Sequence, residues 1–283
     1  MVFREHPLDS RHVPARSREC PVLRRSPRRP SSGDDEPGRQ DPPPAESLDS
    51  TIEWLRSYQA GGFDEIKGWV DPTIFPFLEA VARSQADLDA RGGVVEIGVH
   101  HGRFFIALNG LIDDGATSVA IDVFGRQELN IDQSGKGNRR RFEENLTAHD
   151  RYEGANVRVL EADSTRLRPG DIESLLTSPA RLVSVDGGHT VEHTLSDMRL
   201  AAEIVAEHGL VILDDILNPA WLGVVEGAVR YLESHPTLWP VAIGHNKLVL
   251  APMSFHGRYL ELLARHHPVK ANGSLCGYDL FVV

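Results

Sequence analysis

Cysteine is scarce in this sequence, and long hydrophobic runs are absent from it. Of the 283 residues only two are cysteines, Cys20 and Cys276, and Cys20 falls in a stretch without a periodic apolar pattern. Neither a disulfide framework nor a cysteine metal cluster is therefore expected. No apolar run approaches the roughly 20 residues of a membrane helix, and the amino terminus lacks the apolar stretch of a secretory signal. We expect a cytoplasmic protein with no membrane partner.

Positively charged residues are fewer than negatively charged ones. Lysine and arginine number 30 against 41 acidic residues, which gives a formal net charge of -11 at pH 7. A field of this sign repels a phosphate backbone, so we expect no nucleic-acid partner. A hydrophobic content of 41% still permits a sizeable core. The composition indicates a globular enzyme that acts on small molecules, and it leaves homo-oligomer formation open.

The first 47 residues lack lysine and any periodic apolar pattern. They hold half of the 18 prolines together with nine arginines. Proline at this density prevents an amphipathic helix, and few apolar side chains are available for a core. We therefore expect a disordered Arg/Pro-rich arm over residues 1–47 and one domain, beginning with helices, over residues 48–283.

Helical and apolar patterns begin after this arm. Helices are predicted at Thr51–Ala60, about Thr73–Ala90 and Thr190–His208. Short apolar runs alternate with stretches that are long enough for helices, which is typical of a parallel sheet covered on both faces. These runs are Val94–Ile97, Ser118–Val123, Val157–Leu160, Leu182–Val185 and Leu210–Leu213.

The pattern changes near the carboxyl terminus. Trp239–Gly244 and Lys247–Pro252 flank a short turn and predict an antiparallel hairpin, and Leu275–Val283 predicts one further edge strand. The expected fold class is α/β. We predict a Rossmann-like, seven-stranded, mostly parallel sheet with helices on both faces and an antiparallel C-terminal hairpin.

Glycines and acidic residues follow the first three predicted strands. Gly98 and Gly102 come directly after the first strand and let the backbone approach a ligand. Asp122 ends the second strand, where it can accept hydrogen bonds from both ribose hydroxyls, and Asp163 ends the third. Ligands of open parallel sheets bind at these strand ends, so the residues predict one shared site. A dinucleotide dehydrogenase would favour Gly-x-Gly-x-x-Gly, whose middle glycine is absent here.

Three aspartates follow the fourth and fifth strands. Asp186 ends the fourth strand, and Asp214 and Asp215 end the fifth. If these strands are neighbours, the carboxylates converge and raise one another's pKa unless a cation neutralises them. Oxygen ligands suit magnesium or manganese, so we expect Mg²⁺ or Mn²⁺ at Asp186, Asp214 and Asp215. His189, three residues after Asp186, is the candidate general base.

These motifs together resemble the class I methyltransferases, which use S-adenosylmethionine (SAM). That family has an acidic residue and glycines after the first strand, and an acidic residue at the end of each of the next two strands. By this resemblance the site residues divide among three parts of the cofactor. Glu96, Gly98, His101 and Gly102 would line the methionine end, Asp122 the ribose, and Asp163 with Ser164 the adenine.

The stretch from Asp186 to Gly227 resembles the macrocin O-methyltransferase group, which methylates sugar hydroxyls of antibiotics, and the likeness runs from about Lys67 to Val283. It implies a metal at the ends of strands four and five, with catalytic roles for Asp186 and His189. We expect a SAM-dependent O-methyltransferase that acts on a hydroxyl of a small molecule, either a sugar or a natural product. A methyltransferase-like protein that binds SAM without turnover and a metal-independent methyltransferase are the alternatives.

A polar insertion, Gly125–Arg141, follows the second strand on the rim where ligands bind. It is too polar for the core and lacks the spacing of a phosphate-binding loop. The sequence allows two interpretations, a lid over the cofactor or the acceptor, and a plain surface loop.

Overall fold

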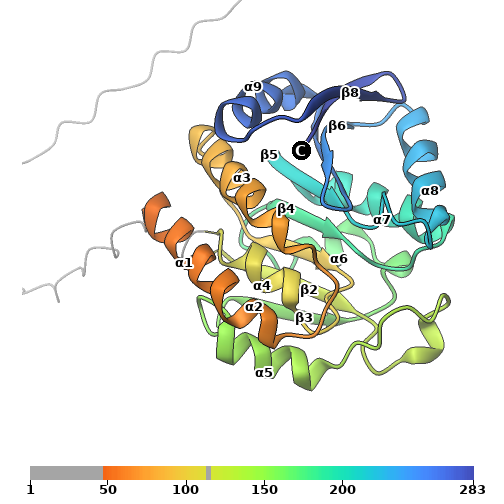
Figure 1. The fold of residues 1–283 in the computed structure, drawn as a ribbon. Helices are drawn as coiled ribbons and strands as arrows, with labels where there is room; N and C mark the ends of the chain where they lie inside the picture. Colours follow the sequence, from red (N-terminus) through yellow and green to blue (C-terminus); the bar gives the residue numbers. More distant parts are fainter. Residues whose placement is uncertain (1–46, 113–115) are drawn as a thin grey trace, which may run out of the picture. The chain divides into compact units, whose positions relative to one another are not determined.

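A nine-stranded sheet forms the centre of the domain (Figure 1). The computed structural model describes residues 47–112 and 116–283, so the predicted arm, apart from Ser47, lies outside the described residues. The strand order is β3-β2-β1-β4-β5-β7-β6-β9-β8. The strands are β1 Val94–Ile97, β2 Ser118–Asp122, β3 Val157–Glu161, β4 Ala180–Val185, β5 Val205–Leu213, β6 Leu238–Gly244, β7 Lys247–Pro252, β8 Ala271–Leu275 and β9 Tyr278–Val282.

The predicted fold class is confirmed, with two strands more than expected. Strands β1 to β5 pair in parallel, and β7 runs antiparallel to both β5 and β6, as the predicted hairpin requires. The single edge strand predicted over Leu275–Val283 is instead a second hairpin. Cys276 and Gly277, with φ of 51° and 85°, turn the chain between β8 and β9. Strand β8 has a polar, largely exposed sequence, so it carries no apolar signal.

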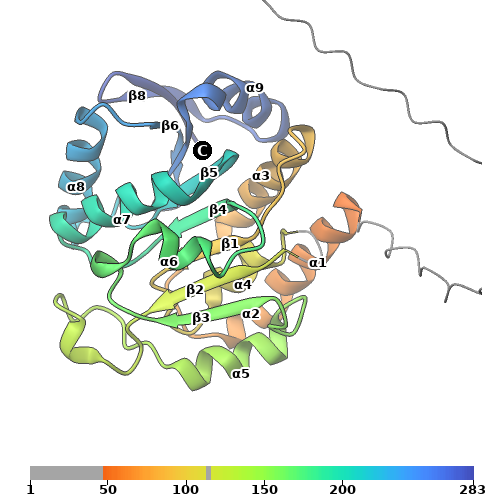
Figure 2. The same ribbon diagram turned by 180° about the vertical axis from the view of Figure 1, so that it is seen from behind.

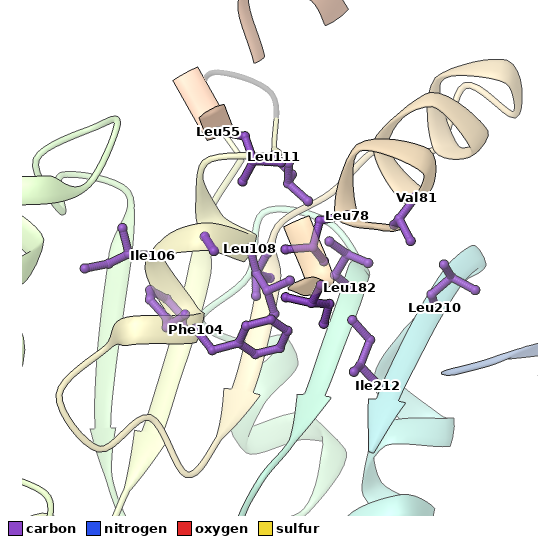
Figure 3. Packing of buried hydrophobic residues seen from close by; sticks show 14 of the residues in the cluster. Leu55, Leu78, Val81, Phe104, Ile106, Leu108, Leu111, Leu182, Leu210 and Ile212 are labelled. Atoms are coloured by element: carbon purple, nitrogen blue, oxygen red, sulfur yellow. The ribbon is translucent and has the colours of Figure 1, made fainter. Parts of the chain in front are cut away.

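Helices cover both faces of the sheet. They are α1 Leu48–Ala60, α2 Gly62–Glu65, α3 Phe75–Asp87, α4 Arg103–Asn109, α5 Arg139–His149, α6 Pro169–Glu173, α7 Val191–Ile204, α8 Leu222–Glu233 and α9 His256–His266. Apolar residues of α1 to α5 and α9 pack on one face, and those of α6, α7 and α8 pack on the other, seen from behind in Figure 2. Successive residues of β1, Val94 and Val95, enter opposite cores because strand side chains alternate. In Figure 3, Leu182, Leu210 and Ile212 of the sheet lie below the helices of the first face.

Helix α7 is shorter than predicted. It begins after the N-cap Thr190, whose side chain accepts a hydrogen bond from the backbone N of His193. It ends at Ile204 rather than His208, because the chain is already extended at Val205 and pairs with Ala180 of β4. No helix among the residues that the structure describes is long and apolar enough to cross a membrane.

Candidate active site

A cavity of about 460 Å³ opens at the carboxyl ends of the five parallel strands β1 to β5. The parallel strands bring their last residues to one edge of the sheet, which is where ligands of such sheets bind. Nearly all the predicted site residues line this cavity, and His101 and Gly102 are the exceptions. Those that line it are Glu96, Gly98, Asp122, Asp163, Ser164, Asp186, His189, Asp214 and Asp215.

The turn after β1 requires both of its glycines. Gly98 has a φ of 88°, and a Cβ atom there would lie 1.7 Å from the backbone oxygen of Asp186. Gly102 has a φ of 90° and packs against the ring of Phe142, where a Cβ atom would lie at 2.8 Å. Gly98 thus brings the ends of β1 and β4 together, whereas Gly102 serves the packing of α4 behind the cavity.

His100, and not His101, lies on the cavity wall. The two imidazole rings stack with centroids 3.9 Å apart, and His101 lies behind His100. Burial, together with the neighbouring His101, lowers the pKa of His100 to about 4, so its ring is neutral at pH 7. The sequence does not indicate which of the two adjacent histidines faces the ligand. In the structure, His100 has a positive φ of 50° and lines the cavity.

Asp122 supports the same turn. Its Oδ2 accepts a hydrogen bond of 2.7 Å from the backbone N of His100, and its Oδ1 accepts one of 2.6 Å from that of Phe124. Burial nevertheless raises the pKa of this carboxyl group. Gly137 of the insertion packs on it, since a Cβ atom there would lie 2.7 Å from Oδ1 of Asp122. One lone pair on each carboxylate oxygen remains for a ligand.

Glu96 and Asp163 occupy different environments. Glu96 is buried on β1, where its Oε1 accepts a hydrogen bond of 2.8 Å from the hydroxyl of Ser184, and burial raises its pKa to about 8. Asp163 caps the short helix η3, Ser164–Arg166, through bonds of 3.1 Å and 2.6 Å from the backbone N and the hydroxyl of Thr165. Only the first of these carboxyl groups is held in a low-dielectric interior.

The three aspartates of β4 and β5 converge, but one of them has a partner that the sequence does not predict. Asp214 forms an ion pair with Lys247, the first residue of β7. Lys247 lies over the ring of Phe104, 4.3 Å from its centroid. Burial opposes the charge of Lys247, but Asp214 and Asp186 outweigh it and raise its pKa. Burial and the neighbouring Asp214 raise the pKa of Asp186 well above its usual range.

His189 is held from three sides. Its Nδ1 lies 2.8 Å from Oδ2 of Asp132, its Nε2 lies 2.9 Å from Oδ2 of Asp215, and its ring stacks on Trp221 at 4.3 Å. Burial lowers the pKa of His189, but the hydrogen bonds to Asp215 and Asp132 prevail and raise it. Asp132 belongs to the polar insertion and was not predicted as a site residue, because no local pattern links it to His189, 57 positions away.

Ligand atoms of Asp186, His189 and Asp215 all lie within 4.8 Å of one another. Among the described residues, this is the group that could hold a metal ion, and His189 takes the place that the sequence prediction gave to Asp214. The physical reason is that Asp214 is neutralised by Lys247. Asp215 remains oriented toward the cavity because Asn218 and Asn246 donate hydrogen bonds of 2.8 Å and 2.7 Å to its Oδ1.

Residues 95–216 match a family model described as a methyltransferase domain. No curated protein matches the sequence. Among solved structures, the O-methyltransferase NovP is similar at 17% identity over 72% of this chain and 97% of that chain, with a TM-score of 0.50. TomG, an O-methyltransferase from Streptomyces achromogenes solved with SAM, is 16% identical over 76% of this chain and 90% of its own, with a TM-score of 0.46.

The matched residues run from β1 to the turn after β5 and so include the cavity-lining ends of the first five strands. The order of the first seven strands in the sheet, with the cavity at the ends of β1 to β5, is that of the class I methyltransferase fold. The prediction of this class is therefore confirmed. The chain contains a methyltransferase domain over residues 95–216 and shares the fold of the O-methyltransferase NovP.

Proposed function

We propose that this enzyme transfers the methyl group of SAM to a hydroxyl group of a small molecule, with His189 as the base. The observation that carries the proposal is the position of His189, whose Nε2 faces the carboxylates of Asp186 and Asp215 in the cavity. The resemblance of Asp186–Gly227 to the macrocin group supports a sugar or natural-product hydroxyl as the acceptor.

The volume of the cavity is compatible with SAM. A volume of about 460 Å³ lies within the usual range for small-molecule sites, roughly 300–1,000 Å³. We assign the methionine end to Glu96 and Gly98, the ribose to Asp122, and the adenine to Asp163 with Ser164. In this assignment His100 takes the lining role first expected for His101, and Gly102 supports the turn from behind.

The donor set near β4 and β5 fits a divalent ion. Carboxylate oxygens of Asp186 and Asp215 within 4.8 Å of each other suit manganese or magnesium, and Asp186 is a buried carboxyl group whose charge needs a cation nearby. We propose that Asp186 and Asp215 hold the ion, with Asp214 and Lys247 as a neutral pair beside them. When bound, such an ion lowers the pKa of a coordinated hydroxyl group.

The transfer itself is a single displacement. The acceptor oxygen attacks the methyl carbon, the bond between this carbon and the sulfur breaks, and the electron pair stays on the sulfur of S-adenosylhomocysteine. The hydroxyl proton passes to Nε2 of His189, which is the ring nitrogen that faces the cavity. A well-placed general base of this kind contributes about 10²–10⁴-fold to a rate.

A metal-independent methyltransferase is the second candidate, and Lys247 favours it. Its buried ammonium group already supplies positive charge to Asp214 and Asp186, which is one part of what a divalent ion would do. In that case turnover needs His189 and Lys247 and survives chelation of metal ions.

Methyl-labelled SAM and a panel of sugars and phenols test the proposed function. We expect the label on an oxygen of at least one compound. A protein that only binds SAM would give saturable binding in calorimetry with no labelled product from any compound.

A further inference from the structure

The insertion between β2 and α5 is built as a self-supporting loop over the cavity. Asn130 donates hydrogen bonds of 2.5 Å and 3.0 Å to the backbone oxygens of Ser134 and Gly135. Oδ1 of Asp132 accepts a bond of 2.9 Å from the backbone N of Ser134. These local bonds present Asp132 toward the cavity, whose wall includes the insertion residues from Leu129 to Asp132.

The loop contacts both halves of the site. At the cofactor half, Gly137 packs on Asp122, since a Cβ atom at this glycine would lie 2.7 Å from Oδ1 of Asp122. At the acceptor half, Oδ2 of Asp132 receives two hydrogen bonds from His189, one of 2.6 Å from its backbone N and one of 2.8 Å involving Nδ1. The side chains of Asp132 and His189 are only 10% and 9% exposed, so these bonds are shielded from water.

Both ring nitrogens of His189 face a carboxylate, Nδ1 that of Asp132 and Nε2 that of Asp215. A carboxylate accepts but cannot donate, so the two carboxylates compete for the single proton of the neutral ring. Asp132 also accepts a hydrogen bond from the backbone N of His189, so it holds the Nδ1 side of this residue through two hydrogen bonds. A proton kept on Nδ1 leaves Nε2 able to accept another. Trp221 holds the plane of the ring, with an angle of 16° between the two planes. Nε2 is thereby aimed into the cavity, toward Asp215.

We propose that Asp132 is the positioning residue for His189, and that the insertion aligns the base by presenting this carboxylate to it. This inference rests on the proposed function, in which His189 accepts the hydroxyl proton. It gives the insertion a role that a plain surface loop would not have, because such a loop would have no effect on the base.

The test compares two charge-neutralising variants of the same insertion. Asp132→Asn removes the carboxylate that holds His189. Glu128→Gln removes a carboxylate that is 68% exposed, pairs at 3.6 Å with Arg126 and does not line the cavity. We expect Asp132→Asn to lower kcat by about 10–100-fold, as is usual when the partner of a functional histidine is lost. KM for the acceptor and the affinity for S-adenosylhomocysteine should change less than about twofold, and Glu128→Gln should match the wild type.

A second measurement does not depend on turnover. In protein with ¹⁵N-labelled histidine, at a pH where the ring is neutral, we expect His189 to carry its proton on Nδ1 in the wild type and in Glu128→Gln. In Asp132→Ala, a substantial fraction of the proton should move to Nε2. Unchanged kcat in Asp132→Asn, an effect confined to KM or cofactor affinity, or an unchanged tautomer in Asp132→Ala would each overturn the inference. If instead His189→Ala keeps full turnover, the proposed function itself fails.

Discussion

The ammonium group of Lys247 and the carboxylate of Asp214 form an ion pair whose side chains are only 3% and 6% exposed. The two residues are 33 positions apart: Asp214 directly follows β5, and Lys247 begins β7, the antiparallel neighbour of β5. A buried charge that loses its partner is costly, because water cannot replace the lost contact.

We therefore expect Lys247→Met to lower the free energy of unfolding by about 3–5 kcal/mol, since it leaves Asp214 buried without a cation. Urea unfolding of the protein without metal or cofactor measures this. The exposed Lys136→Met is the control and should stay within about 0.5 kcal/mol of the wild type. Adding Asp214→Asn to Lys247→Met should restore part of the loss. A loss no larger than that of the control would refute the role of the pair.

The buried carboxyl group of Glu96 predicts a pH dependence of stability. Burial raises its pKa from 4.5 to about 8 in the folded state, so the folded protein binds this proton more tightly than the unfolded chain does. The stabilisation is fully present below pH 4.5 and is lost as the pH rises to about 8, by about 1.4 kcal/mol for each unit of the shift.

Glu96→Gln should remove this component. The difference in unfolding free energy between wild type and variant should thus change steadily from about pH 4.5 to 8 and be flat above that range. The exposed Glu173→Gln serves as the control. A difference that is constant with pH would contradict the buried, protonated state of Glu96.

Asp122 should contribute to cofactor affinity through the ribose. Two ribose hydrogen bonds, each worth about 0.5–1.5 kcal/mol, correspond to SAM binding that is roughly 5–150-fold weaker when both are lost. Asp122→Asn is preferable to Asp122→Ala, because the carboxylate also accepts the backbone N–H groups of His100 and Phe124. Calorimetry with SAM measures the affinity. An unchanged affinity in Asp122→Asn and Asp122→Ala would reject the ribose assignment.

The two adjacent aspartates after β5 should behave differently toward a metal ion. Asp215→Asn removes a proposed ligand and should weaken Mn²⁺ binding by at least about tenfold, whereas Asp214→Asn should weaken it less. Electron paramagnetic resonance of free Mn²⁺ measures both. Chelation should stop turnover, and Mg²⁺ or Mn²⁺ should restore it. Full turnover after chelation would favour the metal-independent candidate, in which Lys247 supplies the positive charge.

The central sheet could be predicted because its strands are buried on both faces and therefore appear as continuous apolar runs. Predicted and observed bounds agree for Val94–Ile97 and Lys247–Pro252. The acidic residues at the strand ends could be found for the same reason, since each directly follows such a run. Strand β8 could not be predicted from the sequence, because it is polar and its one strand partner among the described residues is β9.

The partners within the site could not be predicted from local patterns. Asp132 and Lys247 reach the site from a polar loop and from the first position of an apolar strand, and their contacts exist only after the chain has folded. A lysine that opens an otherwise apolar strand was the available signal for Lys247. For Asp132, the sequence signal was limited to its place in a polar insertion next to the edge of the sheet where ligands bind.

The most direct test of the account is methyl transfer by the wild type and by His189→Ala, measured in single turnover with methyl-labelled SAM, the panel of hydroxyl compounds and Mg²⁺. We predict that the wild type places the label on an oxygen of an acceptor. His189→Ala should bind SAM equally well but transfer the label about 10²–10⁴-fold more slowly. Equal rates in the two proteins, or no labelled oxygen in any compound despite tight SAM binding, would contradict the account.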